Sequence, residues 1–176
     1  MPISMEVAGQ VSEPAGSPAA QRASLAAVLV VLPGMLALLQ FASSRTDLKL
    51  LLFPPLAALG YQVLRFPHSP AAHLRSVVLA PTLACVFGTG LAMAGGLQVW
   101  TAAAATLIGV VIVELLRAHA PATVAVALLP MFSATPSWIY PVSVLLATTA
   151  LYGVFLAWRG IYDRLSASPG EGGPGG

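Results

Sequence analysis

The chain has 176 residues, of which 57% are hydrophobic and 8% are charged. A soluble domain carries about 25% charged residues, so a chain this poor in charge cannot cover a water-facing surface and must expose its outside to lipid. The net charge of +2 is too small for a nucleic-acid-binding surface, and the single cysteine, Cys85, excludes a disulfide framework and a cysteine-based metal cluster.

The two ends of the chain differ in composition from its centre. Residues 1–22 and the stretch ending in Ser-Pro-Gly-Glu-Gly-Gly-Pro-Gly-Gly are rich in Gly, Pro, Ser and Ala. Such segments bury too little apolar surface to offset the entropy cost of ordering. We therefore predict disordered tails over 1–22 and 161–176, with a helical membrane domain over 23–160 between them.

The hydropathy predicts membrane helices along the whole central region. A span needs about 20 mostly apolar residues, and five stretches approach that length: 24–43, 48–65, 76–96, 98–116 and 138–158. In the second stretch Pro54 and Pro55 leave only 54–65 as an uninterrupted helix, about 18 Å long and too short to cross alone. A sixth stretch, 121–132, follows Pro121 and is equally short. The prediction is an all-α integral membrane protein with about four to six membrane helices, two of them short and led by proline.

The two short stretches occupy equivalent places in the two halves of the chain. Each half, 24–96 and 98–158, consists of a long stretch, a short stretch led by proline and another long stretch. This pattern suggests an internal repeat, and two ordinary proline-kinked spans are the alternative. Short helices in repeats are also how many transporters build a site in the middle of the membrane.

The basic residues do not settle whether the short helices cross the membrane or re-enter on the same side. Full crossing places six arginines on one side, opposite Arg45 and Lys49, and satisfies the positive-inside rule with cytoplasmic termini. Re-entry of both gives a split of three to five against that orientation. Helix length favours re-entry and charge favours crossing. The six arginines are Arg22, Arg65, Arg75, Arg117, Arg159 and Arg164.

Small residues recur every four positions in the third and fourth long stretches. They are Ala84, Gly88, Ala92 and Gly96 in one and Ala105 and Gly109 in the other. This spacing lets membrane helices approach closely. Because only residues 95–98 join the two stretches, we predict a tight antiparallel hairpin packed through these residues.

Polar side chains concentrate in two segments, 65–75 and 114–119. Neither contains a nucleotide loop, a nucleophile elbow or a zinc-protease helix, so we predict no enzyme activity and no cofactor. The three histidines lack the spacing of metal ligands, and we predict no metal site. Glu114 and Arg117 are three residues apart and would share a helix face; an interfacial ion pair is the alternative to a functional role. The arginines would either bind a small anion beside the starts of the short helices or snorkel to lipid headgroups.

These two segments carry a resemblance to the HPP membrane proteins, a family named for a His-Pro-Pro motif. The segment 67–76 resembles the first family signature, matching it at Pro67, Ser69, Pro70, Ala72 and Arg75. The segment 117–129 resembles the second, matching it at His119, Pro121 and Ala122. The chain departs from the family pattern where Ala120 replaces the first motif proline, where Thr123 replaces the motif glycine, and where Pro81 replaces a histidine.

The resemblance implies a membrane core of four spans, and plastid and cyanobacterial members of the family are associated with nitrite transport. It therefore implies a transporter or channel-like protein for a small anion, with nitrite as the first candidate. Arg75, His119, Arg117 and Ser69 are the expected binding residues. Their roles would be positive charge for the two arginines, and hydrogen bonding with proton coupling for His119.

A non-transporting membrane scaffold or assembly subunit is the alternative function. The expected partners are the lipid bilayer and the small anion, with no nucleic acid, and the expected location is the plasma membrane. Because so few helices enclose little interior, a homo-oligomer is compatible with the sequence.

Overall fold

The computed structural model describes residues 18–44, 54–118, 120–133 and 135–167, and all the secondary structure in these residues is helical. The α-helices are α1 (Pro18–Ser44), α2 (Pro54–Arg65), α3 (Ala80–Gly95), α4 (Val99–Leu115), α5 (Ala122–Leu128) and α6 (Ile139–Ala167). A 3₁₀ turn, η1 (Pro70–Ala72), and a π-helical turn, η2 (Arg75–Leu79), precede α3, and a second 3₁₀ turn, η3 (Leu129–Phe132), extends α5. The predicted all-α membrane architecture is confirmed.

The helix lengths follow the hydropathy pattern. Three helical stretches are long and apolar enough to cross a membrane, namely Gln21–Leu38 within α1, Arg75–Gly95 and Ile139–Arg164. The two short helices begin where prolines were expected to start them, α2 at Pro54 and α5 directly after Pro121. Proline favours the first turn of a helix because its fixed φ suits that position and its missing N–H has no intrahelical role there.

The predicted limits of the helical domain, 23 and 160, are wrong at both ends. Helix α1 begins at Pro18, and α6 continues to Ala167. The alanines and glutamine after Pro18 are good helix formers, and the buried side chain of Tyr162 gives the last turns of α6 a packing contact. The remaining tail positions, 1–17 and 168–176, lie outside the described residues.

The two short helices cover less length than the helices beside them. At the end of α2, Arg65 Nη1 donates to Ser24 Oγ at 2.7 Å, so this end lies beside the beginning of α1. Helix α1 continues for about 30 Å from Ser24 to Ser44, whereas α2 covers about 18 Å. The segment of α5 runs from Ala118, which follows α4, to Met131, which packs in a cluster with Ala92, near the far end of α3. The two helices have 12 and 7 residues, and whether their segments cross or re-enter the membrane stays a prediction.

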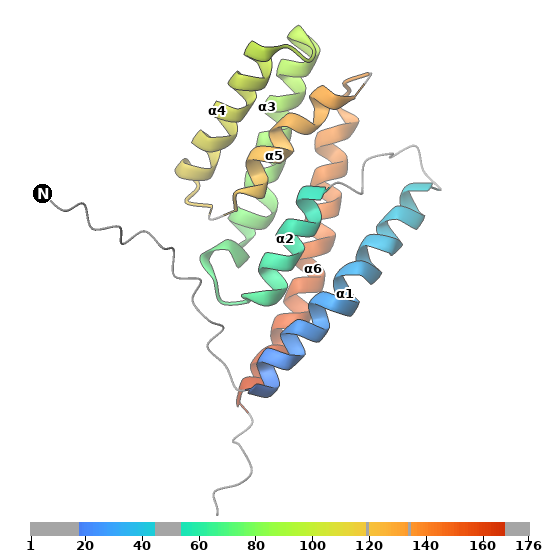
Figure 1. Cartoon of the computed structure of the whole chain (residues 1–176), viewed down its shortest axis with the longest axis vertical. Helices are drawn as coiled ribbons and strands as arrows, with labels where there is room; N and C mark the ends of the chain where they lie inside the picture. The colour runs from blue at the N-terminus through green and yellow to red at the C-terminus, as the bar shows by residue number, and fades with distance from the viewer. Residues whose placement is uncertain (1–17, 45–53, 119, 134, 168–176) are drawn as a thin grey trace, which may run out of the picture.

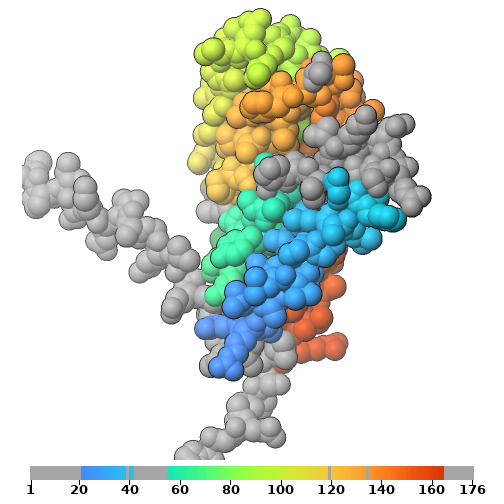
Figure 2. Space-filling model, turned by 45° about the vertical axis from the view of Figure 1, so that its right-hand side comes forward, coloured from blue at the N-terminus to red at the C-terminus, as the bar shows by residue number. Residues whose placement is uncertain are grey.

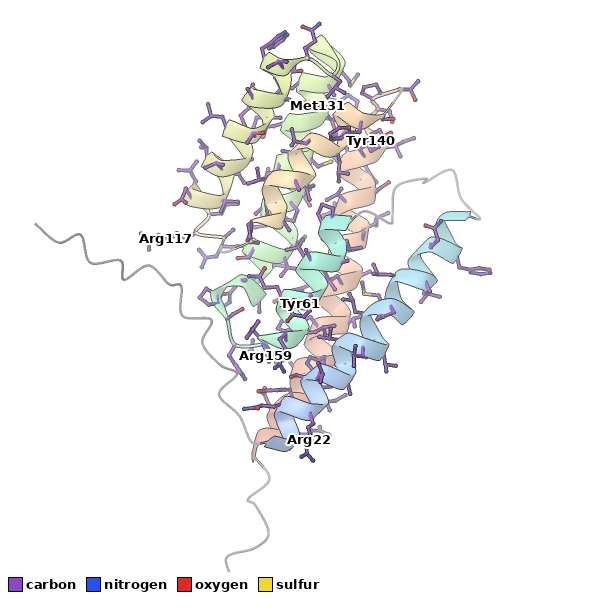
Figure 3. The ribbon with its side chains drawn as sticks, viewed as in Figure 1. Arg22, Tyr61, Arg117, Met131, Tyr140 and Arg159 are labelled. Atoms are coloured by element: carbon purple, nitrogen blue, oxygen red, sulfur yellow. The ribbon has the colours of Figure 1, made fainter. Side chains whose placement is uncertain are left out.

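The labelled arginines lie at different heights along the molecule, with Arg117 near its middle (Figure 3). Figure 3 shows Arg22 and Arg159 toward one end and Met131 and Tyr140 toward the opposite end. The positive-inside rule would place the end with Arg22 and Arg159 on the cytoplasmic side, and this orientation stays a prediction. The counter-charges Arg45 and Lys49 lie outside the described residues.

The helices form two three-helix units that run in opposite directions. One unit consists of α1, α2 and α3, and the other of α4, α5 and α6. Helix α2 packs against α1 of its own unit and α6 of the other, and α5 packs against α4 of its own unit and α3 of the other. Helices α3 and α6 also pack against each other. Exchanging the two units leaves this pattern of contacts unchanged. In Figure 1, α2 and α5 both begin near the middle of the molecule and run toward opposite ends. The internal repeat proposed from the sequence is therefore supported, as an inverted repeat.

Two clusters of buried side chains hold these units together. The first joins α1, α2 and α6 and includes Leu56, Leu59 and Phe155, while the second joins α3, α4 and α5 around small residues such as Ala84 and Ala105. Figure 2 shows α1 lying along α2 on the outside of the first cluster.

The prediction for the small residues is only partly confirmed. Helices α3 and α4 form the expected hairpin, joined at Gly96, which has a φ of 62° and ends α3 rather than continuing its stripe. The glycines of the stripe contact α5, however. A Cβ on Gly88 would meet the backbone of Ala127, and one on Gly109 would lie 3.1 Å from Val124 Cα. The short helix thus occupies the groove that the small residues create, because a missing side chain admits whichever backbone is nearest.

Candidate functional site

The first signature forms a folded loop between α2 and η2. Ser69 accepts an N–H bond from Ala72 at 3.0 Å through its carbonyl, and Ser76 Oγ donates to the Pro70 carbonyl at 3.2 Å. A small hollow of 50 Å³, which we call the Ser69 hollow, is lined by Pro67, His68, Ser69, Ala72, His73 and Arg159. Ser69 Oγ is buried and has no hydrogen-bond partner among the described residues. Its hydroxyl is therefore available for a polar ligand small enough for this hollow.

An ion pair ties this loop to the end of α6. His68 Nε2 lies 3.2 Å from Asp163 Oδ1, and Arg159 Nε lies 4.0 Å from Asp163 Oδ2. The His68 and Asp163 side chains are 55% and 50% exposed, so the pair contributes at most about 1 kcal/mol. His68 thus has a carboxylate neighbour that keeps the loop beside α6.

The arginines of this region differ in their surroundings. Arg75 is exposed at the first position of the π-helical turn that leads into α3. Arg65 is partly buried and bonds to Ser24 and to the Gln21 carbonyl, so it clamps α2 onto α1. Of the two, Arg75 is the more exposed, and Arg65 already bonds to the protein through Nη1.

The second signature segment begins at the turn that ends α4. The Ala118 N–H bonds to the Val113 carbonyl at 2.8 Å, and the Arg117 N–H bonds to the Glu114 carbonyl at 3.0 Å. These two bonds and the φ of 48° at Arg117 define a Schellman motif. Glycine normally occupies this left-handed position, since a side chain there costs about 1 kcal/mol or more. An arginine kept at a strained position points to a role for its side chain.

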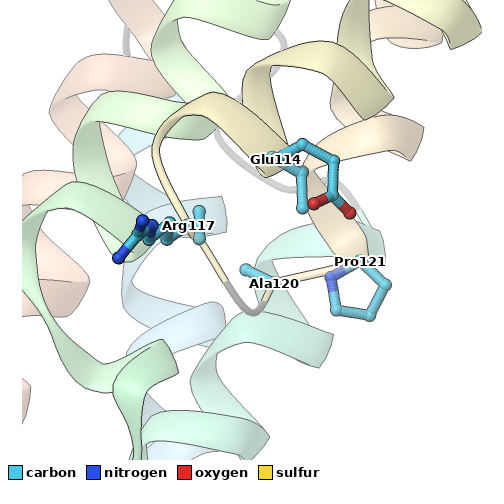
Figure 4. A pocket seen from close by; sticks show the side chains of 6 residues that line it. Glu114, Arg117, Ala120 and Pro121 are labelled. Atoms are coloured by element: carbon cyan, nitrogen blue, oxygen red, sulfur yellow. The ribbon is translucent and has the colours of Figure 1, made fainter.

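A larger hollow opens beside this turn. It measures 370 Å³, is called here the Arg117 hollow, and is lined by Val113, Glu114, Arg117, Ala118, Ala120 and Pro121. In Figure 4 the Arg117 side chain points to the opposite side from the Glu114 carboxylate and Pro121. The prediction that Glu114 and Arg117 share a helix face is therefore wrong, because α4 ends at Leu115 and the chain turns into the left-handed region before Arg117.

The four residues expected to bind the anion are distributed over these features. Ser69 and Arg117 line different hollows, and Arg75 lies at the start of η2. His119 lies outside the described residues, so its expected role in binding stays a prediction. No group of three His, Cys, Asp or Glu side chains among the described residues is placed to hold a metal ion.

The sequence reasoning missed four buried hydroxyl groups without a hydrogen-bond partner among the described residues, those of Thr82, Thr89, Thr123 and Ser143. Thr123 in the first turn of α5 and Ser143 in the first turns of α6 are fully buried, and neither hydroxyl has a hydrogen-bond partner among the described residues. A buried hydroxyl without a partner costs about 1–3 kcal/mol. The available signal was a threonine two positions after a proline that starts a helix in an apolar segment. Thr123 stands where the resemblance places a glycine.

The family model for the HPP transmembrane region matches residues 16–166. The chain belongs to the HPP family. The match spans all six helices and includes both signature segments, so the resemblance seen in the sequence is confirmed and this HPP protein is an integral membrane protein. Neither a curated protein nor a solved structure matches the chain.

Proposed function

We propose that this HPP protein moves a small anion across the membrane, as a transporter or a channel-like protein, with nitrite as the first candidate. The observation that carries the proposal is the pair of short helices in an inverted repeat. Both begin near the middle of the molecule and run toward opposite ends (Figure 1). Inverted repeats with discontinuous helices are how many transporters place a binding site at the membrane midplane.

Local electrostatics supports an anion as the substrate. The first turn of a helix presents N–H groups and about half a positive charge. At the start of α5 this turn carries the buried Thr123 hydroxyl, and Arg117 precedes it by six residues in the lining of the Arg117 hollow. In the proposal Thr123 and the α5 N-terminus hold the anion, Arg117 and Arg75 supply positive charge on the cytoplasmic side, and His119 donates a hydrogen bond and couples a proton.

The test is flux into proteoliposomes over a panel of nitrite, nitrate, formate and chloride. Protein-free vesicles correct for leakage of the protonated acids. Thr123→Val keeps the shape of the side chain and removes an unpartnered hydroxyl, so it should lower flux at least tenfold while leaving the melting temperature equal or higher. Thr148→Val is the matched control, because the Thr148 hydroxyl is also buried but already donates to the Val144 carbonyl at 2.7 Å.

Flux of every anion at the protein-free rate would refute transport. Wild-type flux from Thr123→Val would remove Thr123 from the site without refuting transport itself. Arg75→Ala and Arg117→Ala then test the two arginines, and Arg75→Lys should restore flux only partly, because lysine lacks the planar fork that binds an oxyanion through two bonds.

A non-transporting scaffold is the second candidate, and the arginine positions favour it in part. Arg65 acts as a clamp between helices, and Ser69 and Arg117 line separate hollows. A scaffold would show no flux and would co-purify with a defined partner from the plasma membrane, which is the location that we propose. Cross-linking of the purified protein in lipid vesicles tests the proposed homo-oligomer.

A further inference from the structure

A basic hollow lies between the beginning of α1 and the end of α2, away from both signature segments. It measures 250 Å³ and is lined by Gln21, Arg22, Leu25 and Arg65. We call it the Arg65 hollow. Among the described residues no acidic side chain contributes to its lining. Two arginines beside a hollow without a carboxylate create a positive potential that an anionic group would neutralise.

One of the two arginines is held in place by the protein. Arg65 Nη1 donates to Ser24 Oγ at 2.7 Å and to the Gln21 carbonyl at 3.4 Å. Ser24 is itself fully buried and donates to the Gln21 carbonyl at 2.9 Å. A guanidinium has five N–H donors, and the described residues supply acceptors for Nη1 only. The remaining donors of Arg65 are thus fixed in position before any ligand arrives, which lowers the entropy cost of binding.

The hollow lies where the apolar segment of α1 begins. That segment starts at Gln21, which itself lines the hollow. Directly beyond the hollow, Leu25 and Leu29 are 50% and 66% exposed and lie on the same face of α1 as Arg22. On α2, Tyr61 is half exposed one turn before Arg65. A charged cavity is therefore continuous with an apolar track along two helices, which matches a lipid with a charged headgroup and an acyl chain.

We propose that the Arg65 hollow binds the phosphate of an anionic phospholipid from the cytoplasmic leaflet. Arg22 and Arg65 hold the phosphate, Gln21 contacts the headgroup, and the acyl chain follows Leu25 and Leu29. Basic cavities between membrane helices on the cytoplasmic side are suited to anionic lipids. The alternative source of the same chemistry is a free phosphate ion, which would have no use for the apolar track.

Native mass spectrometry of the full-length protein tests the proposal. The protein is released from vesicles of equal parts phosphatidylglycerol and phosphatidylcholine, and the retained lipids are counted. The wild type should retain one phosphatidylglycerol in preference to phosphatidylcholine. Arg22→Gln should lower that retention at least fivefold, since one basic residue near an anionic surface contributes about that factor, and Arg22→Gln with Arg65→Gln should abolish it.

Arg164→Gln is the matched control, because Arg164 is exposed on the same side but does not line the hollow. It should retain the lipid as the wild type does. Equal retention in Arg22→Gln and the wild type, or equal loss in Arg22→Gln and Arg164→Gln, would overturn the proposal in favour of diffuse attraction. Displacement of the lipid by inorganic phosphate would overturn the choice of a lipid. Because Arg22 makes no bond that holds α1 to α2 among the described contacts, Arg22→Gln keeps the test valid should Arg65→Gln not fold.

Discussion

Gly88→Ala should destabilise this HPP protein although alanine is the better helix former. In the structure the added Cβ would collide with the carbonyl oxygen of Ala127 and lie 2.8 Å from its carbonyl carbon. Both atoms belong to the α5 backbone, so no side-chain rotation can relieve the contact and α3 and α5 must separate. Overpacking of this kind costs about 1–3 kcal/mol, and the gain of about 1 kcal/mol in helix propensity offsets only part of it.

Gly90→Ala on the same helix isolates the steric effect. A Cβ at Gly90 has no atom within 4 Å, so this variant gains the same helix propensity without a collision. The stability difference between the two variants is therefore the contact alone, about 1–3 kcal/mol. For a chain of this size that corresponds to about 2–4 °C in melting temperature per kcal/mol. Thermal unfolding in one detergent measures it. Equal melting temperatures for Gly88→Ala and Gly90→Ala would refute the reading that α5 occupies this groove.

Two further substitutions test local features of the site. Arg117→Gly should raise stability by about 1 kcal/mol relative to Arg117→Ala, because only glycine relieves the left-handed backbone of the Schellman turn, which has a φ of 48°; thermal unfolding of both variants checks this, and an alanine variant as stable as the glycine variant contradicts it. Asp163→Asn should change stability by less than about 1 kcal/mol, and by still less at high salt, because its pair with His68 at 3.2 Å is half exposed; a larger loss would show that the loop 66–74 depends on this pair.

Much of the fold could be predicted because its elements depend on local signals. Hydropathy and proline positions located α2 at Pro54–Arg65 and α5 after Pro121, as the structure has them. The glycine contacts were predicted less well. A stripe of small residues specifies a groove on one helix. Whether α4 or α5 enters that groove depends on long-range packing, and the spacing of residues along one helix does not identify the partner. The end of α6 was also missed, since the burial of Tyr162 includes a contact with His68, which is distant in sequence.

The sequence named candidate residues but did not predict their local geometry. Arg117 was named for its charge, yet its left-handed backbone arises from the Schellman turn at the end of α4, and that turn also directs its side chain away from Glu114. Arg65 seemed equivalent to Arg75 in the sequence, but a bond to Ser24, 41 positions away, makes it structural. Thr123 was treated only as a departure from the family pattern, although a threonine two positions after the proline that starts α5, in an apolar segment, was a signal for a buried hydroxyl.

Helix length and the count of basic residues favour different topologies for the two short helices. Length argued against crossing because a helix of 12 residues covers about 18 Å. Charge argued for crossing, and in the structure both helices begin near the middle of the molecule (Figure 1). A helix that begins inside a membrane leaves polar backbone groups that only protein or enclosed water can satisfy. A proline at the start lowers this cost, because it carries no N–H. The Thr123 hydroxyl adds to the cost instead, since it is buried in the first turn without a partner. A sequence under selection for stability alone would carry valine there, which is why loss of flux without loss of stability in Thr123→Val is the outcome that the transport proposal requires.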